Sequence, residues 1–263
     1  MLPLPDRGFD FGDGLFETLL VVNRTPLFLE LHLQRMQTGL AVLGFPDCLS
    51  KVRAQISLAL ESPGFPEEAA LRVTVTRGSG PRGYLPPPQV QPRIVIASTA
   101  REARQYNKLL SPARLALAKI RWGCQPELAG IKHLNRLEQV LAASECRTAN
   151  SDEVVMLDQD GDVISVSAAN LFLVDGDRLL TPELSHCGVS GTRRRLILKE
   201  LAPALGLQAR EAKVTVAQLE AATEVFYSNA LVGVRPVASF AASHWHQHKV
   251  CDAIHNLYWR RAS

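Results

Sequence analysis

The sequence lacks several features that would place it in a specialised class of protein. Its five cysteines are odd in number and include no C-x-x-C pair, which argues against a disulfide framework or a zinc knuckle and for a reducing cytoplasm. No apolar run reaches the roughly 18 residues that a membrane-spanning helix needs. Charges interrupt the stretch MLPLPDRGFDFGDG at the start, so we expect no signal peptide.

The chain also has little excess charge. Lysine and arginine total 29 against 26 acidic residues, a net charge of +3, which does not predict binding to nucleic acid. With 46% hydrophobic and 21% charged residues, the composition is that of an ordinary soluble globular protein. A chain of 263 residues is long enough for two lobes, each with its own core. We find no internal repeat and no low-complexity tract.

The first third of the chain mixes strand-like and helical patterns. Alternating apolar residues bounded by turn residues predict strands, whereas apolar residues three and four apart predict helices. We expect a turn at Asn23-Arg24 and a helix stop at Gly44. The predicted strands cover 15–23, 69–84 (ending in glycines) and 93–98, and the predicted helices cover 31–44 and 47–61.

A polar stretch, 101–112, predicts a linker between a smaller N-terminal α/β lobe, 1–106, and a larger C-terminal lobe, 107–263, which carries Lys132. In the second lobe, two Asp-Gly pairs between apolar runs predict β-hairpins. Helices are expected from about Gly191 to Leu205 and through CDAIHNLYW near the end. Interleaved helices and hairpin-paired strands indicate an α+β fold with mixed or antiparallel sheets.

One lysine is placed unusually. In LAGIKHLNRLEQVLAAS, residues 128–144, the spacing of Leu134, Leu137, Val140 and Leu141 predicts one helix face, which Lys132 would immediately precede. The helix dipole disfavours an ammonium at that end and so favours the free amine that a Schiff-base lysine needs. The alternative is a solvated lysine at a helix start.

The stretch GIKHLNRLEQVL is accompanied by FGDGLFET, HLQRM, RGSGPRGY, AANLF and SNAL elsewhere in the chain. Together these segments resemble the class IV enzymes that depend on pyridoxal 5'-phosphate (PLP). The resemblance implies a two-lobed fold type IV protein, similar to D-amino acid aminotransferases, with PLP in the cleft between the lobes and a homodimeric assembly. Within the family the chain looks most like the lyases that convert 4-amino-4-deoxychorismate to 4-aminobenzoate and pyruvate for folate synthesis.

The resemblance also assigns residues to the cofactor. Lys132 matches the lysine that holds PLP, and an electron-sink cofactor needs one amine that is nucleophile and then base. Arg35 matches the arginine that binds the PLP phosphate, for which its planar fork is suited. Gly191 and Thr192 open a helix and match a second phosphate contact. Without the resemblance, Arg35 would be a helix-surface charge and GVSGTR a plain helix cap.

Other positions match substrate or cofactor contacts. Arg82 and Tyr84, in GPRGY, match carboxylate-binding groups, which suits a substrate with two carboxylates. Arg77 could instead be structural and pair with an acid. Asn229, in SNAL, matches a position that faces the cofactor, although this segment could also be simple core strand. The run 193–195, three arginines, is expected to be a solvated face.

One position departs from the family pattern. The family has a glutamate four residues after the hairpin glycine, where it pairs with the pyridine nitrogen of PLP, but the same spacing from Gly161 leads to Ser165. A carboxylate keeps that nitrogen protonated, whereas a hydroxyl does not compel protonation. We hypothesise that Ser165 forms a hydrogen bond with the ring nitrogen and biases the enzyme away from transamination. The alternative is that another group makes the contact.

Two other functions fit less well. An aminotransferase of the same fold, acting on D- or branched-chain amino acids, is disfavoured by Ser165 and by KHLNRLEQ. A non-catalytic PLP-binding or scaffold protein is disfavoured by the intact Lys132. The histidines of HWHQH, 244–248, are expected to form a solvated turn rather than a metal site. Members of the family generally have a further strand before the DRG element, residues 6–8. Here only five residues precede Asp6.

Overall fold

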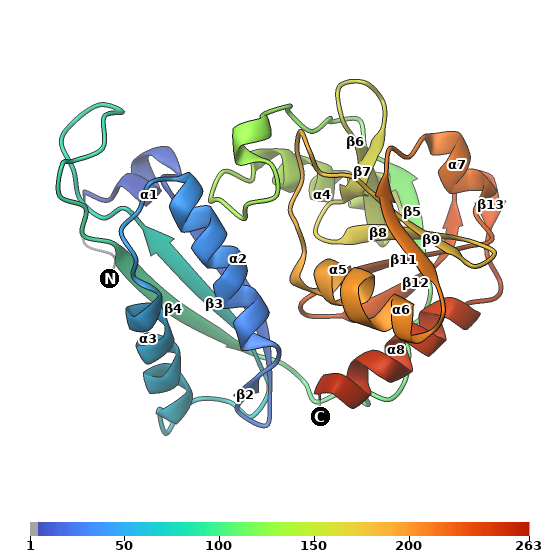
Figure 1. The fold of residues 1–263 in the computed structure, drawn as a ribbon, viewed down its shortest axis with the longest axis horizontal. Helices are drawn as coiled ribbons and strands as arrows, with labels where there is room; N and C mark the ends of the chain where they lie inside the picture. Colours follow the sequence, from blue (N-terminus) through green and yellow to red (C-terminus); the bar gives the residue numbers. More distant parts are fainter. Residues whose placement is uncertain (1–4, 263) are drawn as a thin grey trace. The chain divides into compact units, whose positions relative to one another are not determined.

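The computed structural model describes residues 5–262, which divide into two compact units. The first unit comprises 5–104 and 131–135, and the second comprises 105–130 and 136–262. Figure 1 shows both units coloured along the chain. Of the five residues before Asp6 in which a strand before DRG could form, 1–4 lie outside the described residues. Within the described part of the chain, every helix is too short or too polar to cross a membrane.

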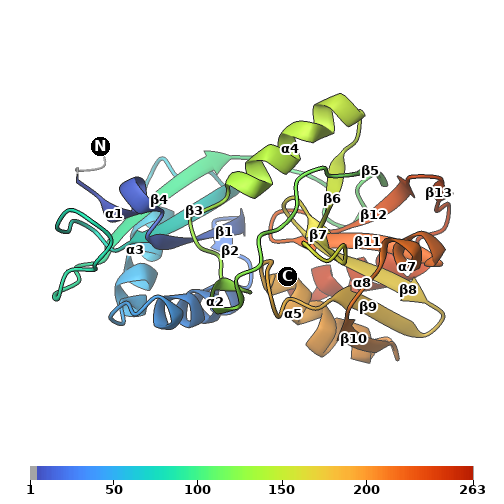
Figure 2. The same cartoon turned by 90° about the horizontal axis from the view of Figure 1, so that it is seen from above.

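The first unit contains α1 (Arg7–Phe11), β1 (Gly14–Val22), β2 (Thr25–Pro26), α2 (Leu29–Val42), α3 (Leu49–Glu61), β3 (Ala69–Thr76) and β4 (Arg93–Ala100). Its strands form an antiparallel sheet in the order β2-β1-β3-β4. Helices α2 and α3 lie on the same side of this sheet (Figures 1 and 2). The predicted strands and helices of this unit are therefore confirmed, except that the strand expected over 69–84 ends at Thr76.

Local chemistry explains these boundaries. Asn23 and Arg24 both have positive φ, as a tight hairpin turn between β1 and β2 requires. The buried residues of α2 recur at helical spacing and face the sheet, whereas those of β3 alternate. Gly44, with φ of 64°, follows the end of α2, which confirms the predicted stop.

A short segment from the middle of the chain belongs to the first unit. Residues 131–135 lie alongside β1 and are hydrogen-bonded to it. The Phe16 amide donates to the Lys132 carbonyl at 3.0 Å, and the Leu134 amide donates to the Gly14 carbonyl at 3.0 Å. Leu15 and His133 form an isolated antiparallel bridge. The sequence placed Lys132 in the C-terminal lobe, whereas these hydrogen bonds attach its segment to β1.

The second unit is built on a nine-stranded mixed sheet. Its strands are β5 (Ala113–Leu117), β6 (Glu153–Leu157), β7 (Val163–Val166), β8 (Asn170–Asp175), β9 (Arg178–Pro182), β10 (Gln208–Ala212), β11 (Glu224–Asn229), β12 (Gly233–Phe240) and β13 (Ser243–His244). The order is β10-β9-β8-β11-β12-β5-β6-β7, with β13 paired to β12. Hairpins join β6 to β7 and β8 to β9, which confirms both predictions made from Asp-Gly pairs.

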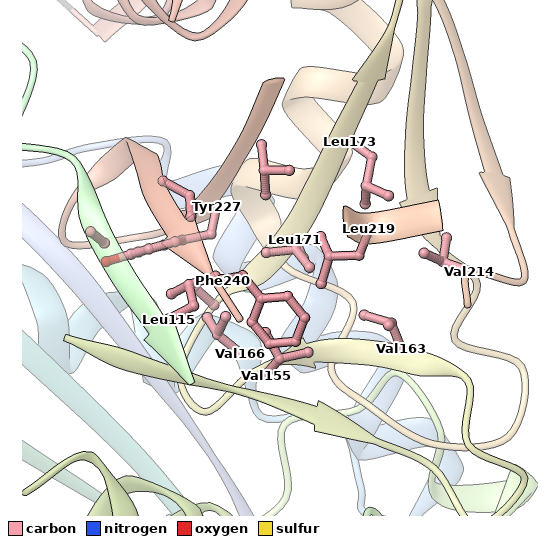
Figure 3. Close-up of a cluster of buried hydrophobic side chains, with 14 of the residues drawn as sticks. Leu115, Val155, Val163, Val166, Leu171, Leu173, Val214, Leu219, Tyr227 and Phe240 are labelled. Carbon is pink, nitrogen blue, oxygen red and sulfur yellow. The ribbon is translucent and has the colours of Figure 1, made fainter. Parts of the chain in front are cut away.

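The sheet of the second unit curls around a core of buried hydrophobic side chains. Figure 3 shows side chains from strands distant in sequence meeting there, among them Leu171 from β8, Tyr227 from β11 and Phe240 from β12. Leu171 and Phe240 are almost completely buried. The opposite face of β8 and β11 carries Phe172 and Phe226, whose rings stack with centroids 4.9 Å apart. Alternate residues of these strands therefore serve two layers.

The helices of the second unit are η1 (Pro126–Leu128), α4 (Leu137–Ala149), α5 (Thr192–Leu196), the π-helical turn η2 (Ile197–Leu201), α6 (Ala202–Ala204), α7 (Val216–Ala221) and α8 (Lys249–Ala262). The segments α5, η2 and α6 follow one another without a break, so the helix predicted from about Gly191 is confirmed, as is the C-terminal helix α8. Thr215 and Gln218 form a reciprocal capping box at the start of α7.

The expectation for α4 was partly wrong. The helix begins at Leu137, five residues after Lys132, so Lys132 does not immediately precede it. Its apolar residues Leu137, Val140 and Leu141 are 78%, 60% and 53% exposed. Apolar periodicity placed Leu137, Val140 and Leu141 on one helix face, as found, but this face is exposed, and Leu134 precedes the helix.

Candidate active site

Lys132 is half-buried beside β1. Its Nζ lies 4.3 Å from the centroid of the Phe16 ring. The helix α4 begins at Leu137, so Lys132 lies outside its first turn, to which the influence of the helix dipole is confined. The argument that a helix start favours the free amine at Lys132 is therefore wrong. The position of the lysine is fixed by the β1 pairing of its backbone instead.

Arg35 belongs to a buried ionic cluster on the same unit. Its Nε and Nη2 donate to the two carboxylate oxygens of Glu17 at 2.7 and 2.5 Å, and His32 Nδ1 lies 2.6 Å from the same carboxylate. Burial opposes ionisation of Glu17, but Arg35 and His32 outweigh it and lower the pKa of Glu17 to about 2. The cluster therefore holds the Arg35 guanidinium in one orientation. Sequence reasoning missed Glu17, although it lies within the segment FGDGLFET.

Arg82 and Tyr84 lie on the loop between β3 and β4. Tyr84 is 85% exposed, and its ring is 5.4 Å from that of Phe11. Arg7 clamps this loop: its Nη1 donates to the Gly83 carbonyl at 3.0 Å and its Nη2 donates to the Tyr84 carbonyl at 2.8 Å. The backbone of the loop is thus held, while the two predicted substrate-binding side chains extend from it.

Arg77 has the structural role that the sequence left open. Its Nε donates to Asp13 Oδ2 at 2.8 Å, and Arg7 donates to the same oxygen at 2.9 Å. Arg77 Nη2 also donates to the Leu43 carbonyl at 2.7 Å. Because both arginines share one carboxylate, Asp13 ties the end of β3 to α1.

Ser165 lies on β7 in the second unit and is 5% exposed. The indole N–H of Trp122 donates to its Oγ at 3.1 Å. A hydroxyl that already accepts a hydrogen bond keeps its own proton for donation to another group. Trp122 was missed from the sequence because it is 43 residues from Ser165 along the chain, and only folding brings the two together.

Gly191 and Thr192 form the tight entry to α5, with Gly191 as its N-cap residue. A Cβ on Gly191 would lie 2.0 Å from Asn170 Oδ1, so a larger residue here would displace the Asn170 side chain. Asn170 Nδ2 donates to the Val189 carbonyl at 2.9 Å and fixes the preceding backbone. Helix-initial N–H groups have no acceptor within their own helix, so this entry is chemically suited to an anion.

The expectation for the arginine run after Thr192 was wrong at two of three positions. Arg193 and Arg194 are 1% and 4% exposed, and Arg195 alone faces solvent. Arg194 Nη1 donates to Glu211 at 3.0 Å, and Arg193 Nε donates to the Tyr258 hydroxyl at 2.9 Å. Hydrogen bonds to Glu211 on β10 and to the buried Tyr258 on α8 account for the difference.

Asn229 ends β11 and organises the turn that follows. Its Oδ1 accepts from the amides of Leu231 and Val232 at 3.0 and 2.9 Å, and its Nδ2 donates to the Ala168 carbonyl at 3.2 Å. The side chain is therefore engaged with backbone, and contact with a cofactor stays a prediction. The histidines of HWHQH include His246, which is exposed, and His248, which is half-buried.

Each unit by itself carries groups whose chemistry suits a phosphorylated aldehyde. In the first unit these are the amine of Lys132 and the guanidinium of Arg35. In the second unit they are the N–H groups and hydroxyl of Gly191 and Thr192. Nearby in β11, the Oγ of Ser228 is buried and has no hydrogen-bond partner within residues 5–262. A buried hydroxyl without a partner is costly, and a bound polar ligand is one means of satisfying it.

The whole chain resembles known proteins. Residues 14–240 match the family model described as amino-transferase class IV. The aminodeoxychorismate lyase of Vibrio harveyi is 34% identical over 92% of this chain and 88% of its own. The D-alanine aminotransferase of Bacillus licheniformis is 25% identical, with 90% of this chain and 82% of its own covered.

Solved structures show the same relationship. The crystal structure of 4-amino-4-deoxychorismate lyase from Pseudomonas aeruginosa is 35% identical, with a TM-score of 0.91, and the match covers 98% of this chain and 94% of that one. The branched-chain aminotransferase of Escherichia coli shares the fold at 21% identity, with a TM-score of 0.89 over 100% of this chain and 90% of its own. The expected two-lobed α+β fold is thus confirmed, and the chain belongs to the amino-transferase class IV family.

Proposed function

We propose that this chain is a PLP-dependent lyase that converts 4-amino-4-deoxychorismate to 4-aminobenzoate and pyruvate. The observation that carries the proposal is the similarity, at 34% and 35% identity over nearly the whole chain, to two proteins named as lyases of this substrate. The aminotransferases among the solved structures are more distant, at 19 to 22% identity for those compared.

In this proposal Lys132 binds the cofactor, and Arg35, Gly191 and Thr192 bind its phosphate. The bidentate pair with Glu17 uses Nε and Nη2 of Arg35 and fixes the plane of the guanidinium. Fixing that plane in advance removes part of the entropy cost of binding a phosphate. Asn229 shapes the turn after β11 and faces the cofactor from there.

When bound, PLP supplies an electron sink and a reactive aldehyde. Lys132, as a neutral amine, removes the proton from the ring carbon that bears the substrate amine. The electrons of that C–H bond enter the ring as the C–O bond to the pyruvate enol breaks, so the ring becomes aromatic. The pyruvate leaves as an enolate, which gains a proton at its methylene carbon to give pyruvate. Arg82 and Tyr84 bind the two substrate carboxylates.

Ser165 distinguishes this site from one that favours transamination. Because Ser165 Oγ accepts from Trp122, its proton is directed to another acceptor, and an unprotonated ring nitrogen is such an acceptor. A hydroxyl donor leaves this nitrogen neutral and weakens the electron sink relative to a carboxylate. Expulsion of a leaving group that makes the ring aromatic needs a weaker electron sink than transamination does.

We further propose that the enzyme is a cytoplasmic homodimer. The exposed face of α4, formed by Leu137, Val140 and Leu141, is apolar at three neighbouring helical positions. Covering these side chains with the same face of a second copy would remove them from water. All five cysteines are free thiols, which fits a reducing compartment.

The test begins with the absorption spectrum of the purified protein. PLP held by a lysine absorbs near the visible region, and borohydride reduction bleaches the band. We expect Lys132→Ala to lose this band and to lower 4-aminobenzoate formation by at least about 10²- to 10⁴-fold, the range for removal of a general base. Lys51→Ala, which changes an exposed lysine on α3, serves as the matched control and should retain both.

Substrate choice is measured on the same preparations. Incubation with 4-amino-4-deoxychorismate should release 4-aminobenzoate, whereas D-alanine with a keto acid should give little transamination. Transamination without 4-aminobenzoate would refute the lyase proposal in favour of an aminotransferase. A wild-type protein that holds PLP but turns over neither substrate would indicate a non-catalytic PLP-binding protein.

A further inference from the structure

Arg193 lies at the junction of three elements of the second unit. It is 1% exposed, and all three nitrogens of its guanidinium donate hydrogen bonds: Nε to the Tyr258 hydroxyl at 2.9 Å, Nη1 to Thr192 Oγ1 at 3.2 Å and Nη2 to the Ala230 carbonyl at 3.4 Å. These partners lie at the start of α5, in the turn after β11, and on α8. One buried side chain thus fixes the geometry of two segments that the proposed site uses.

The bond from Arg193 has a consequence for the Thr192 hydroxyl. A hydroxyl has one proton and two lone pairs. When its oxygen accepts a hydrogen bond from a donor, its own proton points away from that donor. Because Arg193 can only donate, Thr192 Oγ1 must be the acceptor of their bond. The Thr192 proton is therefore available for an acceptor. The oxygens of a phosphate dianion are acceptors only.

A second observation near Thr192 points to a ligand. Ser228 pairs in register with Asn170 across β11 and β8, so their side chains share one face of the sheet. Asn170 Oδ1 on that face lies 2.0 Å from where a Cβ on Gly191 would be. Ser228 is 1% exposed, and its Oγ has no hydrogen-bond partner among residues 5–262. A buried polar atom in this state is expected to be satisfied by a bound group.

We propose that Arg193 is a positioning residue that orients the Thr192 hydroxyl toward the phosphate of the cofactor and thereby selects phosphorylated over unphosphorylated pyridoxal. The inference rests on the proposed function, since it takes Thr192 as a phosphate ligand. Arg193 acts through Thr192 and touches neither cofactor nor substrate. The full burial of the guanidinium adds a positive potential that water screens little.

A purely structural role for Arg193 predicts a different result. If the guanidinium served only to tie α8 to the strands, its loss would weaken the binding of PLP and of pyridoxal equally. Pyridoxal has the same aldehyde for Lys132 but lacks the phosphate. The ratio of the two dissociation constants therefore isolates the phosphate contribution from general damage to the fold.

The experiment measures this ratio by spectroscopic titration of the cofactor-free protein with PLP and with pyridoxal. Arg193→Lys, which keeps the charge but loses the three-way fork, should lower the preference for PLP by about 10-fold, the loss expected for one hydrogen bond to a charged group. Thr192→Val should have a similar effect. The double variant should lose no more than Thr192→Val alone, because Arg193 acts through that hydroxyl.

Two results would overturn the proposal: an unchanged ratio in folded Arg193→Lys, which includes equal weakening of both ligands, or additive losses in the double variant. If Arg193→Lys does not fold, the ratio is measured on Tyr258→Phe, which removes the acceptor of Nε. We expect a several-fold fall there, and a wild-type ratio would refute the inference.

The outcomes separate this inference from the proposed function. A wild-type protein that prefers PLP but makes no 4-aminobenzoate would refute the lyase activity, while the ratio would still decide the role of Arg193. A wild-type protein that binds PLP and pyridoxal equally would refute the phosphate assignment and with it the role of Arg193. An active lyase whose ratio is insensitive to Arg193 would refute this inference alone.

Discussion

Glu17 is the residue whose loss should cost the first unit most. Its carboxylate is almost fully buried and accepts from Arg35 and His32. Glu17→Gln keeps the shape but removes the charge that the partly buried Arg35 guanidinium pairs with. Deleting one partner of a buried ion pair typically costs about 3 to 5 kcal/mol, so we expect a fall of this size in the free energy of unfolding at pH 7.

The pH dependence of this cost follows from the pKa of Glu17. Folding lowers that pKa from 4.5 to about 2, so the stabilisation is fully present above pH 4.5 and is lost as the pH falls toward 2. A shift of this size corresponds to about 3 kcal/mol in total, of which about 2 kcal/mol is lost by pH 3. The stability difference between wild type and Glu17→Gln should shrink accordingly.

Equilibrium urea unfolding at pH 7, 5.5 and 3, followed by circular dichroism, measures this difference directly. Glu30→Gln is the matched control, because Glu30 pairs with Arg53 on the surface, where an ion pair contributes little. A difference between wild type and Glu17→Gln that stays constant from pH 7 to pH 3 would refute the reasoning. So would a Glu30→Gln variant that loses as much stability as Glu17→Gln.

Two further predictions concern the chemistry and the assembly. Ser165→Glu restores the carboxylate that the family usually has and should raise alanine transamination relative to 4-aminobenzoate formation, measured by coupled assays; no gain would count against the role given to Ser165. Leu137→Asp and Val140→Asp place charges on the apolar face of α4 and should shift the protein from dimer to monomer in sedimentation experiments, whereas Arg147→Gln on the same helix should not. A dimer that persists in both variants would exclude this face as the interface.

Much of the fold could be predicted because its signals are local. Apolar spacing marked α2 and α3, alternation marked β3, and Asp-Gly pairs marked the hairpins. Each of these patterns acts within a few residues through backbone geometry and the burial of one face. The charge run after Thr192 misled the prediction, since burial of Arg193 depends on Tyr258, 65 residues away along the chain.

The candidate site was harder to predict for the same reason. The segment containing Lys132 was identified, yet its setting beside β1 depends on hydrogen bonds to residues near Phe16. The contact of Trp122 with Ser165 is likewise long-range. Periodicity also identified the apolar face of α4. It did not predict whether the rest of the chain would bury that face.

The path of the chain through residues 131–135 has a consequence for dissecting the protein. This segment is hydrogen-bonded to β1, yet it is covalently flanked on both sides by residues of the second unit. A fragment ending at residue 104 would therefore carry β1 without its lysine-bearing neighbour. A fragment starting at residue 105 would carry Lys132 on a segment stripped of its pairing strand. Neither fragment by itself would hold the Lys132 amine in its place beside β1, which requires both parts of the chain.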